Sequence, residues 1–357
     1  MSDGLEGVVA AETVLSEVDG ANGRLIIRGR SLDELAGHTT FEDAVGLLFG
    51  GFYPDLPADT RAALGRARAE VFAEVSALDT GLLDRTPIEA MRALTARLAD
   101  GDDVRTAFRL LAAPAVFTAA VVRAQAGEAP VEPDPSLRHS VDILRMLRGA
   151  PPSKAEADAL DTYLVTVSDH GLNASTFAAR VVASTRAGLT SAVLAGVSAL
   201  KGPLHGGAPG PVIEMLEEIG EPGNARAWIE AALARGDRLM GFGHRIYKVR
   251  DPRADALKTA VRWLDARQGR LEFAEAVEAA ALAILREHKP DRSLETNVEF
   301  YTALLLEALD FPPSAFTCVF AMGRVAGWLA HAREQLAGGR LIRPASVYVG
   351  PMPRKAA

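Results

Sequence analysis

Helical spacing of apolar residues extends over almost the whole chain after Phe41 and is the feature that most limits the possible folds. These stretches are rich in Ala, Leu, Arg and Glu, which favours helices. Strand-like alternation is scarce. Its clearest example, 24–28, follows a turn-like segment at 19–23, so we expect a short N-terminal β-hairpin there. The sequence therefore predicts a mainly α-helical protein.

The predicted helices are separated by breaks rich in proline or glycine. They are expected, with ends placed to within roughly two to four residues, at about 41–50, 58–76, 87–98, 103–126, 137–147, 153–168, 174–187, 189–200, 210–219, 224–234, 252–266, 271–287, 296–309 and 314–337. With 357 residues, the chain is long enough for about two domains.

Composition and charge exclude several classes of function. The single cysteine, Cys318, leaves no intrachain disulfide framework and no multi-cysteine zinc site. The net charge of −7 disfavours nucleic acid as a general partner, because phosphate binding needs a basic face. The first six residues lack the basic and apolar parts of a secretion signal, so a cytoplasmic location is expected.

One segment, 315–330, is apolar enough to raise the question of a membrane span. It falls short of the ~20 residues that a span needs, and Arg324 lies near its middle. A buried helix in a soluble core is the better interpretation. Because an unpaired guanidinium group in a core costs several kcal/mol, Arg324 should face a carboxylate. That carboxylate comes either from the protein, as an internal salt bridge, or from a ligand.

Two histidines lie in loops that suit a binding site. His205 lies among glycines, which let a ligand approach the backbone closely. His170 precedes a predicted helix that Asn173 or Ser175 could cap, which places it near a helix N-terminus, where anions bind. Either histidine could instead be satisfied by local structure, and both interpretations stay open at this stage.

A third histidine, His244, lies in the glycine-containing segment 241–248. Four basic residues follow it within nine positions, against one acid. In a chain of net negative charge, this pattern predicts a local anion-binding site. Arg253 falls in the first turn of a predicted helix that Asp251 would cap, where a cation is disfavoured unless an anion is near.

A carboxylate and a further arginine complete the set of candidates. Glu299 is the single acid of the apolar helical stretch 297–301. Burial raises the pKa of a carboxyl group, which can then act as a base, although an ion pair with a nearby Arg or Lys is the alternative. Arg343 lies in 340–344, near the C-terminus, and basic residues are common on the surface of such terminal segments. His331 is interpreted as structural.

Taken in order, these segments closely resemble the citrate synthase family over the length of the chain. The matching segments are Gly4 to Thr13, Gly23-Arg24-Leu25 with Arg28-Gly29, Asp169-His170 with Asn173 to Thr176, Lys201 to Ala208, Gly241 to Arg245 with Tyr247-Lys248, Asp251-Pro252-Arg253, Gly323-Arg324, Gly327 to His331, and Ile342-Arg343-Pro344. Each segment is a weak signal alone, whereas the ordered set is highly specific.

The resemblance implies a citrate synthase-like fold of two helical domains. The large domain would comprise 1–206 plus 312–357 and begin with the β-hairpin, and the small domain would be inserted at 207–311. The short N-terminus resembles the dimeric members of the family, so a tight homodimer is expected, with sites built from both chains. A cleft between the domains would close over substrate and exclude water.

The resemblance also implies roles in catalysis. His205 would donate to the thioester oxygen of acetyl-CoA while Glu299 removes the methyl proton. Such a proton is very weakly acidic, so its removal needs a placed base and stabilisation of charge at the oxygen. His244 would polarise the carbonyl group of oxaloacetate, and His170 would help to bind that substrate.

The remaining implied roles concern binding. The carboxylates of oxaloacetate would be held by Arg253, Arg324 and Arg343, the last reaching in from the partner subunit. CoA would contact the loop residues Gly241, Phe242, Gly243, Arg245 and Lys248, with Arg245 or Lys248 at its phosphates. No metal or cofactor is expected, since the CoA thioester is a substrate.

Two positions depart from the family pattern. Glu299 stands where the family usually has aspartate, so its carboxylate group lies one methylene farther from the backbone. A misplacement of roughly 1 Å can cost about a hundredfold in rate. Pro209 stands where the family often has asparagine and removes an N–H group beside the His205 loop.

Three functions follow from the resemblance and its departures. The first is a citrate synthase that condenses acetyl-CoA with oxaloacetate and water to give citrate and CoA. The second is a 2-methylcitrate synthase that uses propionyl-CoA, because one methylene is worth only about 1–3 kcal/mol of discrimination in a pocket. The third is a catalytically silent paralogue that only binds CoA or dicarboxylates. Retention of the candidate histidines and arginines favours the first two.

Overall fold

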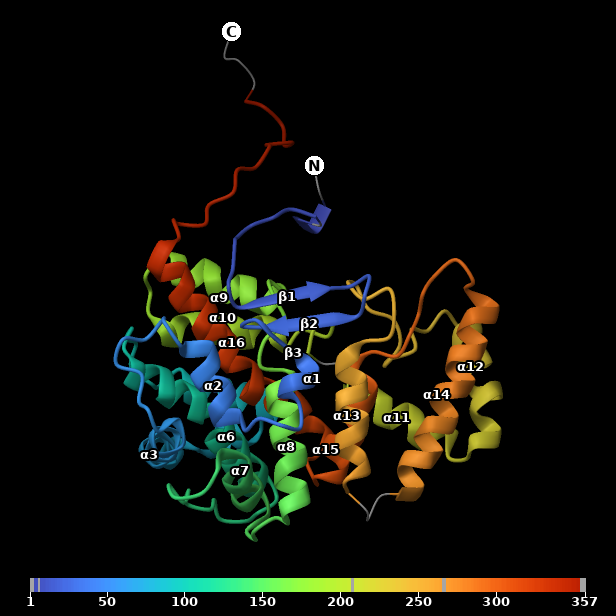
Figure 1. Ribbon diagram of the computed structural model, residues 1–357, viewed down its shortest axis with the longest axis horizontal. Helices are drawn as coiled ribbons and strands as arrows, with labels where there is room; N and C mark the ends of the chain where they lie inside the picture. Colours follow the sequence, from blue (N-terminus) through green and yellow to red (C-terminus); the bar gives the residue numbers. More distant parts are fainter. Residues whose placement is uncertain (1–2, 6, 207–208, 265–267, 354–357) are drawn as a thin grey trace.

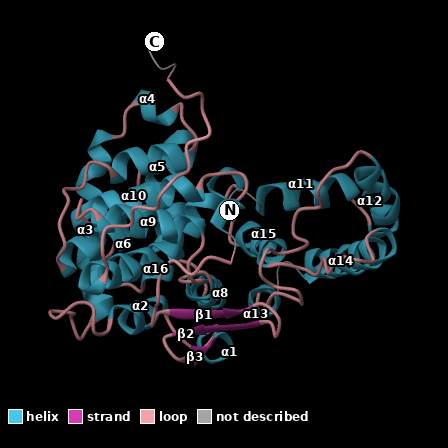
Figure 2. Ribbon diagram, turned by 90° about the horizontal axis from the view of Figure 1, so that it is seen from above, coloured by secondary structure: helices cyan, strands magenta, loops and turns pink. Residues whose placement is uncertain are grey.

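The chain folds almost entirely into helices, as the sequence predicts (Figure 1). The computed structural model describes residues 3–5, 7–206, 209–264 and 268–353. These residues form sixteen α-helices and one three-stranded antiparallel sheet. The helices are distributed over two lobes of unequal size (Figure 2).

The larger lobe is built around one long helix, α16. Its helices are α1 (Leu32–Leu35), α2 (Phe41–Phe49), α3 (Thr60–Phe72), α4 (Thr80–Leu83), α5 (Pro87–Thr95), α6 (Val104–Gln125), α7 (His139–Arg148), α8 (Lys154–Thr166), α9 (Ala174–Ser184), α10 (Leu189–Leu200) and α16 (Phe316–Gly338). α16 packs against α6, α8, α9 and α10, so the lobe has a central helix that is covered on several sides.

The smaller lobe contains five helices. They are α11 (Pro209–Ile219), α12 (Ala225–Ala234), α13 (Pro252–Arg262), α14 (Gln268–His288) and α15 (Val298–Ala308). α13 packs against both α15 and α8, so α13 joins the two lobes (Figure 1). The predicted domain boundaries at 206/207 and 311/312 stay predictions, and residues 207 and 208 lie outside the described part of the chain.

The only described sheet lies at the N-terminal end of the chain. Its strands are β1 (Ser16–Asp19), β2 (Arg24–Ile27) and β3 (Arg30–Ser31), paired antiparallel in the order β1-β2-β3. Leu25 and Ile27 are buried, whereas Arg24 is exposed and Ile26 is half-buried, as the alternation predicted. The hairpin is therefore confirmed. The third strand was not predicted, because two residues are too few to show a pattern.

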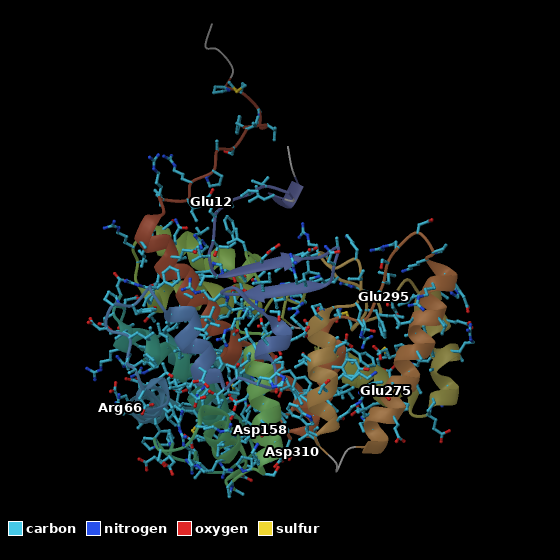
Figure 3. All side chains as sticks on the ribbon, viewed as in Figure 1. Glu12, Arg66, Asp158, Glu275, Glu295 and Asp310 are labelled. Atoms are coloured by element: carbon cyan, nitrogen blue, oxygen red, sulfur yellow. The ribbon has the colours of Figure 1, made fainter. Side chains whose placement is uncertain are left out.

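Every predicted helix has a counterpart among the described residues. The predicted starts of α2 and α9 coincide with the observed ones, at Phe41 and Ala174. The start of α3 was placed two residues early, and its cap is Asp59, which accepts the N–H of Ala62. On this helix the buried residues recur at helical spacing, whereas Arg66 is exposed on the outer face (Figure 3). The short helices α1 and α4 were missed, and part of the predicted helix 252–266 lies outside the described residues.

Pro209 occupies the first position of α11. Proline is well tolerated there, since the first N–H groups of a helix have no intrahelical acceptor. The missing N–H group therefore costs α11 no hydrogen bond.

The apolar segment 315–330 lies within α16 and is buried, Arg324 included. The core-helix interpretation of this segment is thus confirmed. Of the described helices, only α6 is long and apolar enough to cross a membrane, and 78% of its most apolar window is buried in the fold. Cys318 is buried in α16, and burial raises the pKa of its thiol to about 12.

Two glycines let α16 approach the end of α8 and the loop that follows it. A Cβ atom at Gly323 would lie 2.5 Å from Val167 Cγ2, and one at Gly327 would lie 2.4 Å from the carbonyl oxygen of Ser168. The Gly327 N–H group donates to that oxygen at 3.1 Å. No larger residue fits at either position without moving backbone.

We expect Gly327→Ala to lower the free energy of unfolding by about 1–3 kcal/mol, the usual cost of overpacking. The matched control is Gly338→Ala in the same helix, where a new Cβ atom would meet nothing within 4 Å. That variant should be neutral or slightly stabilising, because alanine favours helices. Urea unfolding followed by far-UV circular dichroism measures both, and equal midpoints for the two variants would contradict the close-packing argument.

Candidate active site

A cavity of about 610 Å³ receives residues from both lobes. The predicted site residues that line it are His170, His205, Gly241, Phe242, Gly243, His244, Arg245, Arg253, Glu299 and Arg324. They come from five segments that are far apart in sequence. Residues 4, 5, 7, 8 and 10 of the N-terminal segment also line the cavity, which the sequence did not predict.

Two predicted site residues do not line this cavity. Lys248 directs its Nζ atom to the carbonyl oxygen of Arg245 at 3.3 Å, so its ammonium group lies against its own loop. Arg343 is exposed in the extended C-terminal segment, which runs away from the body of the molecule (Figure 1).

His170 lies in the loop between α8 and α9 and is 5% exposed. The loop turns at Gly171, whose φ is +60°, and Asn173 then caps α9 by accepting the N–H of Thr176 at 3.1 Å. Of the two caps that the sequence allowed, Asn173 is the one observed. The Nε2 atom of His170 lies 3.2 Å from the Tyr247 hydroxyl. Burial and the charges of Arg253 and Arg324 lower the pKa of His170 well below its usual value, so its ring is neutral.

His205 follows α10, and its Nε2 atom lies 2.8 Å from the Ser175 hydroxyl. A neutral imidazole carries one N–H group. The single proton of the Ser175 hydroxyl has two acceptors within reach, Asn173 Oδ1 at 2.8 Å and His205 Nε2. When that proton is donated to Nε2, the N–H group of His205 is on Nδ1 and can donate to a ligand. Burial, followed by the charges of Arg324 and Arg253, lowers the pKa of His205 to about 4. The ring is therefore a neutral hydrogen-bonding group at neutral pH.

His244 has a defined tautomer, because its Nδ1 atom accepts the backbone N–H groups of Ile246 at 3.1 Å and Tyr247 at 3.0 Å. The proton of the neutral ring is then on Nε2. Burial and the Arg253 charge lower the pKa of His244 to about 4. Nε2 lies 3.3 Å from Nη2 of Arg253. Two donors therefore converge, and a ligand oxygen that accepted from both would relieve this close approach.

The loop that carries His244 is held at the N-terminal end of α15. Gly241 and Gly243 adopt φ values of +88° and +80°, which glycine allows at little cost. The side chain of Asn297 donates to the Gly243 carbonyl oxygen at 2.8 Å, and its backbone N–H group donates to that of Gly241 at 2.9 Å. The loop and α15 thus hold one another in place.

Arg253 is 4% exposed and forms an ion pair with Asp251. Nε lies 3.0 Å from Oδ1 and Nη2 lies 2.8 Å from Oδ2. Asp251 also accepts the backbone N–H groups of Arg253 at 3.0 Å and Val298 at 3.2 Å, so one carboxylate serves the N-terminal ends of α13 and α15. The anion that the sequence required near Arg253 is therefore Asp251, whose second role the sequence did not reveal.

Arg324 is 1% exposed, and its Nε atom donates to the carbonyl oxygen of Val167 at 2.7 Å. Its guanidinium carbon lies 4.8 Å from the centre of the Phe320 ring. Among the described residues, no carboxylate lies within ion-pair distance of Arg324, so the internal salt bridge is not observed. Burial and the charge of Arg253 lower the pKa of Arg324 to about 10, against the opposing effect of Asp169.

Glu299 lies in the first turn of α15 and lines the cavity. No ion pair forms between its carboxylate and another described residue, which excludes that alternative for the part of the chain described. Burial raises its pKa to about 7, with the charges of Arg253 and Arg324 opposing and that of Asp251 adding to the effect. The group is therefore poised to exchange a proton near neutral pH.

The cavity thus combines two buried cations, three neutral imidazoles and one carboxyl group that titrates near neutrality. Such a set can hold an anionic ligand, donate hydrogen bonds to developing negative charge and remove a proton. No group of three or more His, Cys, Asp or Glu residues among those described could hold a metal ion. The sequence analysis missed Ser175 and Tyr247 as partners of the histidines, although both lie inside segments that it had singled out.

Comparisons with known proteins agree with this arrangement. The family model for citrate synthase, C-terminal domain, matches residues 4–345. The chain is 41% identical over 360 residues to putative citrate synthase 2 of Mycobacterium tuberculosis (98% of this chain, 93% of that protein) and 35% identical over 370 residues to 2-methylcitrate synthase of the same species (97% and 90%).

A solved structure with the same fold contains ligands. It is the citrate synthase of the thermophilic archaeon Thermoplasma acidophilum, in a ternary complex with carboxymethyl coenzyme A and oxaloacetate. The match has a TM-score of 0.86 at 28% identity and covers 100% of this chain and 98% of that one. From the family model, the relatives and the fold, we conclude that the chain belongs to the citrate synthase family.

Proposed function

We propose that this protein is a citrate synthase, which condenses acetyl-CoA with oxaloacetate and water to give citrate and CoA. The observation that carries the proposal is the unpaired carboxyl group of Glu299, with a pKa of about 7, in the same cavity as two buried arginines and a neutral His205. A base and an anion site together are what this condensation requires.

Oxaloacetate would occupy the cationic part of the cavity. Arg253 and Arg324 would hold its carboxylates, and the Nε2–H group of His244 would donate to its carbonyl oxygen. That donor already points toward Arg253, at 3.3 Å between the two nitrogen atoms. His170, which is buried and neutral, would add a hydrogen bond without adding charge.

Acetyl-CoA would react at the boundary between Glu299 and His205. Glu299 would take a proton from the methyl carbon while His205 donates to the thioester oxygen, and the resulting enol would attack the polarised carbonyl carbon of oxaloacetate. Water would then hydrolyse the thioester and release CoA. The backbone of the 241–243 segment and the Arg245 side chain would contact CoA, since all four residues line the cavity. Lys248 would act on the loop instead, through its contact with the Arg245 carbonyl oxygen.

The functional unit would be a homodimer, located in the cytoplasm. The C-terminal segment exposes apolar side chains, among them Val347 at 66%, Tyr348 at 69% and Val349 at 87%. Exposed apolar chain of this kind marks an interaction site. Arg343 lies in the same segment, away from the cavity of its own chain, so a partner's cavity is its proposed destination.

Propionyl-CoA is the alternative substrate, because a related protein at 35% identity is a 2-methylcitrate synthase. The experiment that tests the proposal is the release of CoA thiol from purified protein with oxaloacetate and either acetyl-CoA or propionyl-CoA. A higher kcat/KM with acetyl-CoA supports the proposal, and a preference for propionyl-CoA supports the alternative. No release with either thioester, from folded protein that still binds oxaloacetate, would support the silent paralogue.

Replacing the proposed base should remove activity. We expect Glu299→Gln to lower kcat by about 10²–10⁴-fold, because the amide cannot accept the proton. Calorimetry should still detect oxaloacetate binding. The matched control is Glu307→Gln on the same helix, whose carboxylate pairs with Arg270 at 3.0 Å and does not line the cavity. Equal losses in the two variants would mean that Glu299 acts on folding and not on chemistry.

Activity should depend on pH through the same carboxyl group. Below about pH 7 Glu299 is protonated and cannot accept a proton, so kcat/KM should fall as the pH falls through 7 and reach a plateau above it. His205 and His244, with pKa values of about 4, stay neutral over this range and contribute no further limb. A profile that is flat across about pH 5 to 8 would exclude Glu299 as the titrating base.

Mixing two inactive variants tests whether each active site uses residues from both subunits of the dimer. Glu299→Gln and Arg343→Ala should each be inactive as homodimers. If Arg343 acts in the partner's cavity, a hybrid dimer contains one intact site, and random reassembly restores about one quarter of wild-type activity. If Arg343 acts in its own chain, both sites of the hybrid are defective and the mixture stays inactive. CoA release after denaturation and joint refolding distinguishes the two cases.

A further inference from the structure

The N-terminal hairpin contacts two of the three loops that carry the site histidines, those of His170 and His244. At one end of β1, the Ser16 hydroxyl donates to Asp169 Oδ2 at 2.5 Å and accepts the backbone N–H of Gly171 at 2.8 Å. These two partners lie on either side of His170. One serine side chain therefore holds the His170 loop from both sides.

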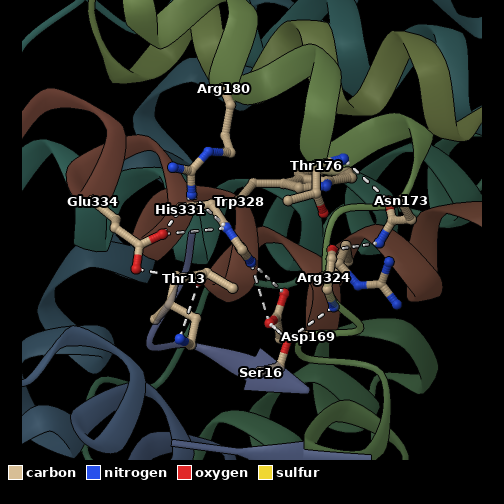
Figure 4. Close-up of polar contacts among 12 residues, drawn as sticks. Thr13, Ser16, Asp169, Asn173, Thr176, Arg180, Arg324, Trp328, His331 and Glu334 are labelled. Atoms are coloured by element: carbon tan, nitrogen blue, oxygen red, sulfur yellow. Dashed lines mark hydrogen bonds and ion pairs between the residues drawn. The ribbon is translucent and has the colours of Figure 1, made fainter. Parts of the chain in front are cut away.

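Asp169, which receives the Ser16 hydroxyl, is itself fixed from the opposite direction. It is fully buried, and His331 of α16 lies 3.2 Å from its Oδ1 atom (Figure 4). His331 is in turn 3.0 Å from Nη1 of Arg180 on α9. Ser16 is thus anchored to the interior of the larger lobe and not to a surface loop.

At the other end of β1, the hairpin turn meets the loop that carries His244. The carbonyl oxygen of Gly20 accepts the backbone N–H of Lys248 at 2.9 Å. A Cβ atom at Gly20 would lie only 2.2 Å from the Ile246 carbonyl oxygen, so a glycine is needed for this close approach. Farther along the turn, a Cβ atom at Gly23 would lie 2.9 Å from Val249 Cγ2.

The link between these two ends is stiff. Ser16 and Gly20 are separated by one paired strand, in which each residue spans ~3.4 Å, so the ends lie about 14 Å apart. Among the described residues, the ring contacts between the two loops are those of His170 with His244 and with Tyr247. The His170 and His244 rings are 5.6 Å apart between centroids.

We propose that β1 is a positioning strap, in which Ser16 and Gly20 fix the His170 loop and the His244 loop at the separation that oxaloacetate binding needs. Neither residue lines the cavity. Both are positioning residues that act through His170 and His244. The strap would also connect the two lobes, since Ser16 is bound to the larger lobe and Gly20 to the loop that precedes α13. This inference rests on the proposed function.

Three variants and one control test the strap by kinetics. Ser16→Ala removes both hydrogen bonds, and Gly20→Ala forces the 246–248 backbone away. Each should raise the KM for oxaloacetate about tenfold, the effect of one to two lost hydrogen bonds, while the KM for acetyl-CoA changes less. Ser16→Thr keeps the hydroxyl group and should restore the wild-type KM. Ala21→Ser, an exposed neighbour in the same turn, should have no effect.

Hydrogen exchange of the unliganded protein tests the strap without relying on activity. If β1 couples the loops, Ser16→Ala should speed exchange in the distant segment 244–250 as well as in the adjacent segment 169–173. Gly20→Ala should likewise speed exchange in 169–173 as well as in the adjacent segment 244–250. The double variant should then be less than additive. Exchange that rises only in the loop next to each substitution, with an unchanged KM for oxaloacetate, would overturn the inference. Wild-type protein that neither binds oxaloacetate nor releases CoA would refute the proposed function, and the exchange pattern would still decide on the strap.

Discussion

Two guanidinium groups buried in one cavity are the constraint on which the rest of the site depends. Arg253 is neutralised by Asp251, whereas Arg324 has a carbonyl oxygen, an aromatic ring and no ion pair among the described residues. Placing a second cation in the same enclosed space without full compensation is unfavourable in the absence of a ligand. The cavity is therefore prepared for negative charge before any ligand arrives.

The other titratable groups respond to this charge and to burial. The pKa values of His170, His205 and His244 are all lowered, so three side chains that could carry charge are neutral hydrogen-bonding groups. Glu299 is affected differently. The arginines oppose the rise in its pKa, but burial prevails and leaves it near 7. The same environment thus keeps the imidazole donors neutral and brings the pKa of the Glu299 carboxyl group near 7. Proton removal from carbon needs this combination.

Local signals predicted most of the fold and much of the site. Helices followed from spacing and caps, and the loops with His170, His205 and His244 were recognisable from glycines and neighbouring charges. What remained hidden depends on contacts between distant segments. Ser16 and Asp169 are 153 positions apart, and the Val167 carbonyl oxygen that Arg324 binds is 157 positions from it. No pattern in either segment names its partner. Arg343 could be given a role only through the family resemblance, because its side chain meets no site within its own chain.

Because Cys318 is the only cysteine, the distance between the two lobes can be measured on labelled variants. Cys318 is enclosed in α16, and its thiol, with a pKa of about 12, stays protonated and out of reach of reagents. Any cysteine added on the surface would then be the only reactive thiol. A pair of dyes attached to one added cysteine in each lobe would report the distance between the lobes, molecule by molecule, with no background from the native chain.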